Sequence, residues 1–317
     1  MPHINRYLHK FFWIVWAILL FKTSFAQAPA DTAITGKKVI TLSPIVVSKQ
    51  LDVPAFISKI KADSSYYKAF KNLRILGYTA INDIRMNDKK GGLIASLYSK
   101  TRQHRRNNCR SMEILSSVSS GDFYTADSAY NYYTAQMYAS LFFTTGTVCG
   151  ETNIVGNLSL STKNKQGIEK HKEQLKMLFF NPGRRISGLP FMSSKTEIFS
   201  DDIAQCYSMN IDYAQRNGRP CYVFTQKVKP GSEDDVVIDE MTTWFDEQSF
   251  EVLARNYSLS YDALLYDFKV QMEVEMTTIA GLTVPTVIRY VGNWKAVSKK
   301  RERGVFTATL FDFNTGN

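Results

Sequence analysis

The sequence predicts an α+β protein built on a strongly curved antiparallel β-sheet, a half-barrel, with helices packed on its concave face. Two observations predict this fold. From residue 206 onward, apolar and polar residues alternate with a period of two, and the alternating segments recur every 10–15 residues, which indicates a meander of antiparallel strands. Before residue 181, apolar residues recur at helical spacing, so amphipathic helices are available to cover the apolar face of a sheet large enough to curl.

The N-terminal segment, residues 1–26, has the three parts of a secretory signal. Positive charges precede an unbroken apolar run, Phe11–Phe21, and small side chains precede a cleavage point between Ala26 and Gln27. The run is shorter than the roughly 20 apolar residues that span a bilayer. We therefore expect cleavage and export, with an uncleaved anchor as the alternative.

Composition limits the classes of function. Loss of the signal removes three of the 39 basic residues and none of the 29 acidic ones, which leaves the mature chain with a net charge of +7. An exported protein rarely meets nucleic acid, so this charge either suits an anionic lipid or envelope surface or is an ordinary solvated exterior. The mature sequence keeps two histidines, His104 and His171. Their scarcity argues against a histidine metal site and a Ser-His-Asp triad, and no cofactor or metal is expected.

The first elements follow from caps and apolar spacing. Residues 27–50 are expected to form a flexible leader with one extended segment. A helix capped by Asp52 carries Val53, Phe56, Ile57 and Ile60 on one face, and a second short helix covers 66–73. The next elements are expected as strands at 73–86, 93–100 and 110–118, with a turn at 89–92 and the basic stretch Arg102–Arg106 as the connection between the last two strands.

The middle of the chain, residues 125–190, is predicted to be a helix-rich insert within a single domain spanning 51–317. Asp127 is expected to cap a helix that bears Tyr130, Tyr133, Met137 and Leu141 at helical spacing. A second helix over 167–180 is expected to end at Asn181-Pro182-Gly183.

The second half predicts strand register as well as strands. Over 268–276 the even positions are apolar and the odd ones are Lys, Gln or Glu, and seven such strands fit into 206–313, with two or three earlier strands joining them. Residues 207–215 and 219–228 flank Asn217-Gly218, the signal of a two-residue hairpin turn. Such a turn sets Arg216 opposite Arg219, and Cys221 opposite Ala214.

This register tests the pairing of the cysteines, Cys109, Cys149, Cys206 and Cys221. Cys206 lies eight residues along the strand from the partner of Cys221, which is roughly 26 Å at ~3.3 Å per residue. A disulfide needs Cα atoms within about 7 Å, so these two cannot pair across a regular hairpin. Cys109–Cys149 is the permissible local disulfide, and four free buried thiols are the alternative.

The segment Val237–Val252 carries a further pattern. A strand ends in Trp244-Phe245-Asp246, a short turn follows, and the next strand starts with an apolar pair. Together with the phrase Gly281-Leu282-Thr283-Val284-Pro285, this resembles the hairpins of the periplasmic lipoprotein-carrier (LolA-like) half-barrel superfamily. The resemblance covers residues 200–313 and extends over 55–180 only by element order. The chain as a whole also resembles uncharacterised exported proteins of Gram-negative bacteria.

The resemblance implies a protein of the periplasm or associated with the outer membrane, whose cupped sheet holds acyl chains or another apolar ligand. The carrier's gating arginine matches no position in this sequence. Aromatic and Met side chains are the candidates to line such a cavity, or else they fill a core. They are Tyr133, Met137, Phe179, Trp244, Tyr257 and Met272.

A second candidate site is the basic stretch between Lys100 and Arg110. Arg102, Arg105 and Arg106 are expected to contact phosphate or anionic head groups, or else to be a solvated hairpin tip. Cys149-Gly150-Glu151 would hold a reactive thiol only with His104 or His171 as its base, and nothing in the spacing supports that.

The sequence therefore favours a non-enzymatic envelope protein that binds a lipid or other apolar ligand in a curved sheet, or docks on envelope proteins. The alternative is a structural or interaction module of an outer-membrane assembly, its sheet filled by its own side chains. A hydrolase would require a histidine within reach of Cys149 or a serine in a cleft. The ligand and the oligomeric state are not predicted.

Overall fold

The structure is a computed structural model of the 317-residue chain, and it describes residues 51–155, 177–186, 192–262, 266–296 and 300–316. It also gives the backbone of a two-stranded ribbon, β1 (Thr32–Thr35) and β2 (Lys38–Thr41). The predicted signal with its cleavage point, and most of the helix expected at 167–180, lie outside the described residues. The elements below belong to one compact unit, Asp31–Asn317.

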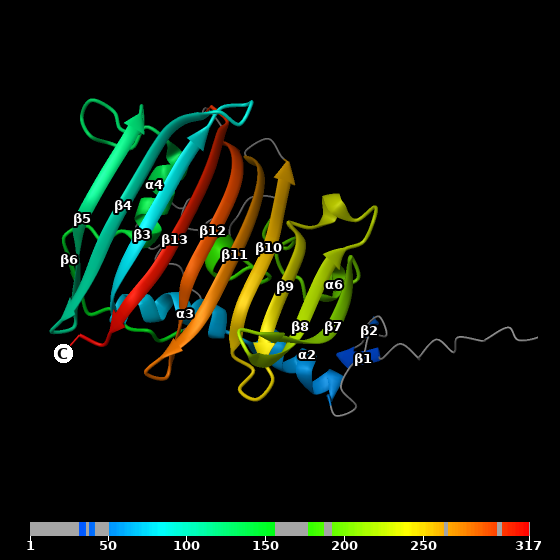
Figure 1. Ribbon diagram of the computed structural model, residues 1–317. Helices are drawn as coiled ribbons and strands as arrows, with labels where there is room; N and C mark the ends of the chain where they lie inside the picture. Colours follow the sequence, from blue (N-terminus) through cyan, green and yellow to red (C-terminus); the bar gives the residue numbers. More distant parts are fainter. Residues whose placement is uncertain are drawn as a thin grey trace, which may run out of the picture. The chain divides into compact units, whose positions relative to one another are not determined.

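An antiparallel sheet of 11 strands forms the body of this unit (Figure 1). Its spatial order is β6-β5-β4-β3-β13-β12-β11-β10-β9-β8-β7, and the sheet does not close on itself. The strands are β3 (Gly77–Asn87), β4 (Leu93–Arg106), β5 (Cys109–Gly121), β6 (Thr147–Cys149), β7 (Tyr207–Arg216), β8 (Arg219–Val228), β9 (Ile238–Asp246), β10 (Val252–Asp262), β11 (Tyr266–Ile279), β12 (Leu282–Ala296) and β13 (Glu302–Asn314).

The sheet consists of two meanders joined at one long-range pairing. The predicted run of seven strands from residue 206 is confirmed as β7 to β13, each paired with the next. Four earlier strands, rather than two or three, form the other meander. The last strand of the chain, β13, pairs with the first of the earlier strands, β3, so that Phe306 lies opposite Ile84.

Helices cover one face of the sheet (Figure 1). The elements are α2 (Val53–Ala62), α3 (Ser65–Asn72), the 3-10 turn η1 (Leu73–Ile75), α4 (Tyr133–Phe142), α6 (Asp201–Ala204), the 3-10 turn η2 (Glu233–Asp235) and one helical turn at 177–180. The predicted cap of α2 is confirmed, since the Asp52 carboxylate accepts a hydrogen bond of 3.0 Å from the Ala55 amide. The helical turn ends before Asn181, as its stop signal predicts. Among the described residues, no helix combines the length and hydropathy of a membrane-spanning segment.

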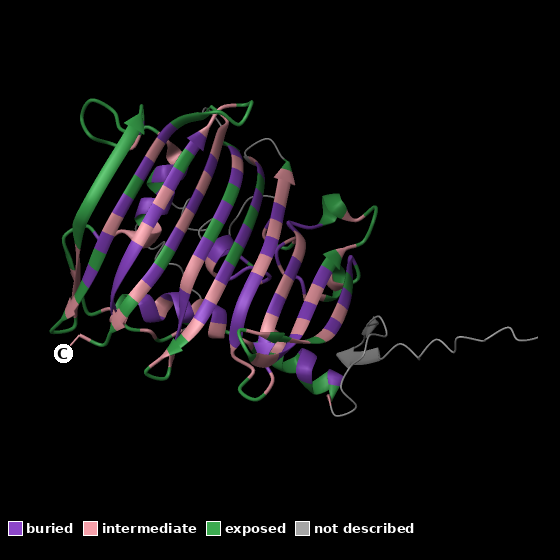
Figure 2. Cartoon of the chain, in the orientation of Figure 1, coloured by how far each residue is buried: buried purple, intermediate pink, exposed green. Residues whose placement is uncertain are grey.

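The predicted curved half-barrel with helices on its concave face is confirmed. Figure 2 shows buried and exposed residues alternating along the central strands. On β11, Phe268, Val270, Met272 and Val274 are at most 3% exposed, as the even-position pattern requires. The described core is one cluster that joins these inward side chains to α2, α3, α4 and the turn 177–180.

The structure decides between the two alternatives for the cysteines. The hairpin register is confirmed, with Ala214 opposite Cys221 and Arg216 opposite Arg219. Cys206 and Cys221 are buried free thiols, and Cys109 forms a disulfide with Cys149. The alternative of four free thiols is therefore wrong.

Two sequence predictions about local structure were wrong. The basic stretch is not the connection between two strands: β4 runs on to Arg106, and the turn is Asn107-Asn108, both at positive φ. Asn tolerates that conformation, so the turn forms there. Nor does Asp127 cap α4, which begins at Tyr133. Asp127 instead accepts a hydrogen bond of 2.5 Å from Thr125 within a turn.

Candidate functional site

The concave face is closed by aromatic rings that the helices insert between inward side chains of the sheet. Phe56 of α2 meets rings of β8 and β9 at centroid distances of 5.5–6.1 Å. The ring centroids of Tyr66 on α3 and Tyr257 on β10 are 6.5 Å apart, and those of Tyr138 on α4 and Phe306 on β13 are 4.1 Å apart. Such ring contacts add to the burial of apolar area. The cover therefore extends across the sheet from β8 to β13.

A small apolar cavity remains between α3, α4, the turn 177–180 and the inner face of the sheet. Its volume is about 10 Å³, and Met137, Phe179 and Met272 are among the side chains that line it. A cavity of this size has room for about one water molecule. Three of the six predicted ligand-lining residues thus meet at one place, where the described side chains leave no room for an acyl chain.

The other three predicted lining residues lie elsewhere. Tyr257 is buried beside this region and donates a hydrogen bond of 2.7 Å to the carbonyl of Phe179. Tyr133 is half-buried at the start of α4. Trp244 lies on the opposite face of the sheet, because its neighbours on β9 take the inward positions. The guanidinium of Arg216 stacks on the Trp244 ring at 4.1 Å.

The interior also holds a charged side chain, Arg255, that the sequence analysis did not select as a candidate. Arg255 of β10 is 6% exposed, lies 4.3 Å from the ring of Tyr66, and donates a hydrogen bond of 2.9 Å to Thr243. Burial lowers the pKa of this guanidinium, and the charge of Asp63 opposes that shift. Arg255 shares the odd-numbered inward positions of Tyr257 and Leu259 on β10, so strand alternation places this charged side chain on the buried face.

The predicted head-group residues gather at a surface depression of about 660 Å³. Arg102, Arg105 and Arg106 all line it, together with Asn314 at the end of β13 and Gly316 in the segment that follows. That segment reaches Arg105 past the start of β3. The chain thus brings the end of β4 together with the end of β13, where Asn314 is the last strand residue, around one basic hollow.

The three arginines do not share one face of β4. Arg102 and Arg106 are exposed on the outward side, whereas Arg105 is half-buried at an inward position. One terminal nitrogen of Arg105 bonds the Asn108 side chain, and the other is buried with no hydrogen-bond partner among the described residues. A buried donor left unpaired is costly, so the guanidinium of Arg105 is only partly satisfied by the described residues. Asp312 is the one carboxylate among the described lining residues.

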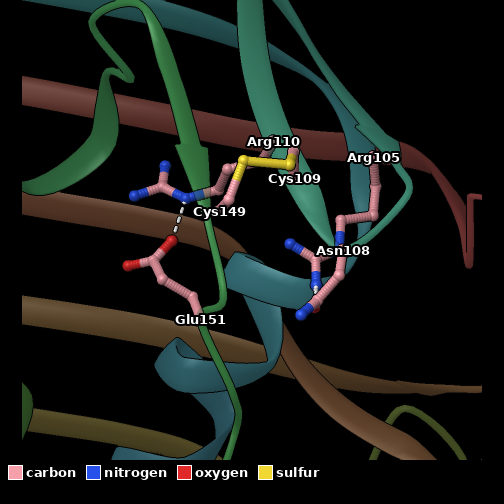
Figure 3. Close-up of a disulfide and its surroundings, with 6 residues drawn as sticks. All are labelled: Arg105, Asn108, Cys109, Arg110, Cys149 and Glu151. Carbon is pink, nitrogen blue, oxygen red and sulfur yellow. Dashed lines mark hydrogen bonds and ion pairs between the residues drawn. A yellow bond between two sulfur atoms is a disulfide. The ribbon is translucent and has the colours of Figure 1, made fainter.

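The disulfide stands beside this hollow and fixes the short edge strand β6 to β5 (Figure 3). Next to it, Arg110 bonds the carboxylate of Glu151, which also lies 3.2 Å from Arg74. Burial by itself would raise the pKa of Glu151, but the hydrogen bond and charges of its basic neighbours hold that pKa below the ordinary value. The network holds the base of β4 and β5 to the turn after α3.

Catalytic arrangements find little support among the described residues. Cys149 is in a disulfide, so it is no free nucleophile. His104 is exposed and pairs with Glu113 at 3.1 Å, and His171 lies outside the described residues. The described part of the chain contains no group of three or more metal-binding side chains.

Comparisons with known proteins find solved structures with a similar fold. No protein-family model and no curated protein matches the chain. Three solved structures are similar to it over 79% of this chain and 91% of theirs. They are a DUF1329 family protein from Desulfovibrio piger (12% identity, TM-score 0.25), a domain described as an outer membrane lipoprotein-sorting protein from Vibrio parahaemolyticus (9%, 0.25) and a LolA superfamily protein from Nitrosomonas europaea (12%, 0.23). The superfamily that the sequence resembles is thus among the matches.

Proposed function

We propose that this chain is an exported, non-enzymatic protein of the cell envelope that binds phosphate-bearing groups in the basic hollow at the end of β4. The observation that carries the proposal is the convergence of Arg102, Arg105 and Arg106 on one depression of about 660 Å³. Guanidinium groups match the geometry of phosphate oxygens. Within the described residues, one terminal nitrogen of Arg105 has no hydrogen-bond partner.

The half-barrel serves in this proposal as a filled scaffold rather than as a container. Among the described residues, the cavity between the helices and the sheet measures about 10 Å³, far less than the about 300–1,000 Å³ of pockets that hold small-molecule ligands. This favours the interaction module over the lipid container among the two functions that the sequence suggests.

The test uses the full chain, expressed with its leader and purified after export. Arg102→Gln/Arg106→Gln removes two charges from the hollow, and Lys89→Gln/Lys90→Gln removes two exposed charges from the turn at the other end of β4. Binding to vesicles containing phosphatidylglycerol is expected to weaken about thirtyfold in the first variant, from about 1 kcal/mol per basic residue. The second variant is expected to bind like the parent.

Titration with inorganic pyrophosphate shows whether the bound phosphate group belongs to a membrane lipid or to a soluble ligand. Binding to both probes supports a phosphate site in general, and binding to pyrophosphate alone supports a soluble anion. Asp312→Asn removes the carboxylate of the hollow and is expected to tighten both. Equal binding by the two double variants, or no binding to either probe, would overturn the proposal.

A second candidate function is the binding of an apolar ligand in the concavity. The wholly apolar lining of the small cavity, with Met137, Phe179 and Met272, favours it, because Met side chains adapt to irregular volumes. A ligand would have to displace α4 or the turn 177–180. Native mass spectrometry of the purified chain tests this, and Met272→Trp, which overfills the cavity, is expected to remove any bound lipid.

A further inference from the structure

The edge strand β5 continues beyond the hydrophobic core, and its second half is solvated on both faces. On β4, the inward residues Leu97 and Ser99 are 2% and 3% exposed. Their partners on β5, Ser119 and Ser117, are exposed, as is every residue from Glu113 to Gly121 (Figure 2). The hydrophobic core thus ends at β4. Burial of side chains therefore does not explain why β5 continues as far as Gly121.

The outer edge of this strand is open within the described residues. The neighbouring strand β6 pairs with Cys109, Arg110 and Ser111 and goes no further. From Met112 to Gly121, the backbone on that side meets no described strand. A long open edge without charges is a template for another strand.

The side chains of the open edge lack the usual protection against pairing. Between Arg110 and Asp122, β5 carries a single ionisable residue, Glu113. Val118 is 68% exposed and lies opposite Tyr98, which is 50% exposed on the same outward face of β4. The opposite edge of the sheet differs, because β7 carries Asp212 and Arg216. One irregularity, at Leu115, interrupts the pairing of β5 with β4, and the uninterrupted stretch beyond it on the open edge is Ser116–Gly121.

We propose that β5 pairs with β5 of a second copy of this chain, antiparallel about a twofold axis, so that the two sheets become one. We choose a second copy of the chain as the partner because the segment Ser116–Gly121 is uncharged and, apart from Val118, contains only Ser and Gly. Two copies of this segment approach without like charges or steric conflict, although each mature chain carries a charge of +7. With Val118 near the axis, Tyr98 and Val118 of both copies form one apolar row across four strands.

Sedimentation of the exported full chain over a concentration series tests the proposal, with a reversible dimer as the expected result. Val118→Lys sets two like charges close together at the axis and is expected to weaken the dimer at least about tenfold. Val291→Lys is the matched control, because Val291 is 51% exposed on the strand β12. A chain that stays monomeric at every concentration, or a dimer unaffected by Val118→Lys, would overturn the proposal.

Cross-linking supplies a second measurement that does not depend on the stability of the lysine variant. Single cysteines at Ser117, Val118 and Ser119 sample the registers near the axis, since Cα atoms of paired residues lie about 4.5–5.5 Å apart, within the range of a disulfide. At least one is expected to form a covalent dimer on mild oxidation. Val291→Cys is expected to form none, and equal cross-linking at all four positions would contradict edge pairing.

Discussion

The guanidinium of Arg255 lies 3.9 Å from the carboxylate of Asp63. Asp63 ends α2 and accepts a hydrogen bond of 2.9 Å from the Ser65 amide at the start of α3. Arg184 also donates to the carbonyl of Asp63, at 2.8 Å. One residue between two helices is thus tied to the middle of the sheet and to the segment after the turn 177–180.

We predict that Asp63→Asn destabilises the fold while keeping the bond from Ser65. The substitution leaves the buried charge of Arg255 without its counter-charge, which typically costs about 3 kcal/mol. Urea denaturation measures the change. Asp83→Asn is the control, because its partner Arg85 is 58% exposed and solvent screens such a pair. Equal urea midpoints for the two variants would show that the buried charge of Arg255 does not need Asp63 as its counter-charge.

The start of α4 depends on a side chain from the far end of the chain. Glu302 of β13 accepts hydrogen bonds from the amides of Tyr133 and Thr134, at 2.8 and 2.7 Å, and from the Thr134 hydroxyl at 2.6 Å. These amides have no partner within the helix, and a carboxylate at this end also complements the helix dipole.

We predict that Glu302→Ala loosens α4 from the sheet and lowers the free energy of unfolding by about 1–2 kcal/mol, the usual cost of a lost cap. Hydrogen exchange of the α4 amides is expected to accelerate more than that of β11. Glu302→Gln keeps an acceptor oxygen and is expected to retain part of the protection. Unchanged exchange in Glu302→Ala would assign the position of α4 to its apolar face alone.

The sequence predicted those parts of the fold that local patterns determine. The even positions of β11 face inward because period-two alternation follows from strand geometry. The register of β7 and β8 follows from the Asn217-Gly218 turn. In contrast, the pairing of β13 with β3 joins segments more than 200 residues apart, and no local pattern encodes it.

The candidate sites were predicted less evenly. Arg102, Arg105 and Arg106 were selected as a group, and they do line one hollow, but the sequence placed them in a turn. The signal for the actual turn was Asn107-Asn108, which the run of basic residues obscured. Trp244 belongs to the aromatic residues from which the sequence predicts a cavity lining, but its position on β9 turns it outward.

The third prediction concerns the contribution of the disulfide to stability. Cys109 and Cys149 are 40 residues apart, and closing such a loop in the unfolded chain is worth about 4 kcal/mol in the chain-entropy model. Cys109→Ser/Cys149→Ser is expected to lose about this much. Cys206→Ser serves as the comparison, because that buried thiol closes no loop. A reducing agent is expected to lower the midpoint of the parent and leave that of the double variant unchanged.

The last prediction concerns acid stability and follows from Glu151. Its basic neighbours hold the pKa of this carboxyl below the ordinary 4.5 in the folded chain. A lowered folded pKa contributes stability that is fully present above the unfolded value and is lost as the pH falls through 4.5 toward the folded pKa. The stability difference between the parent and Glu151→Gln is therefore expected to be constant near neutral pH and to shrink on acidification. Urea midpoints across a pH series measure it, with Glu273→Gln as the control, because Glu273 and Arg289 are both more than half exposed. If the difference between parent and Glu151→Gln stays constant down to about pH 3, the pairing with Arg110 contributes nothing to acid stability.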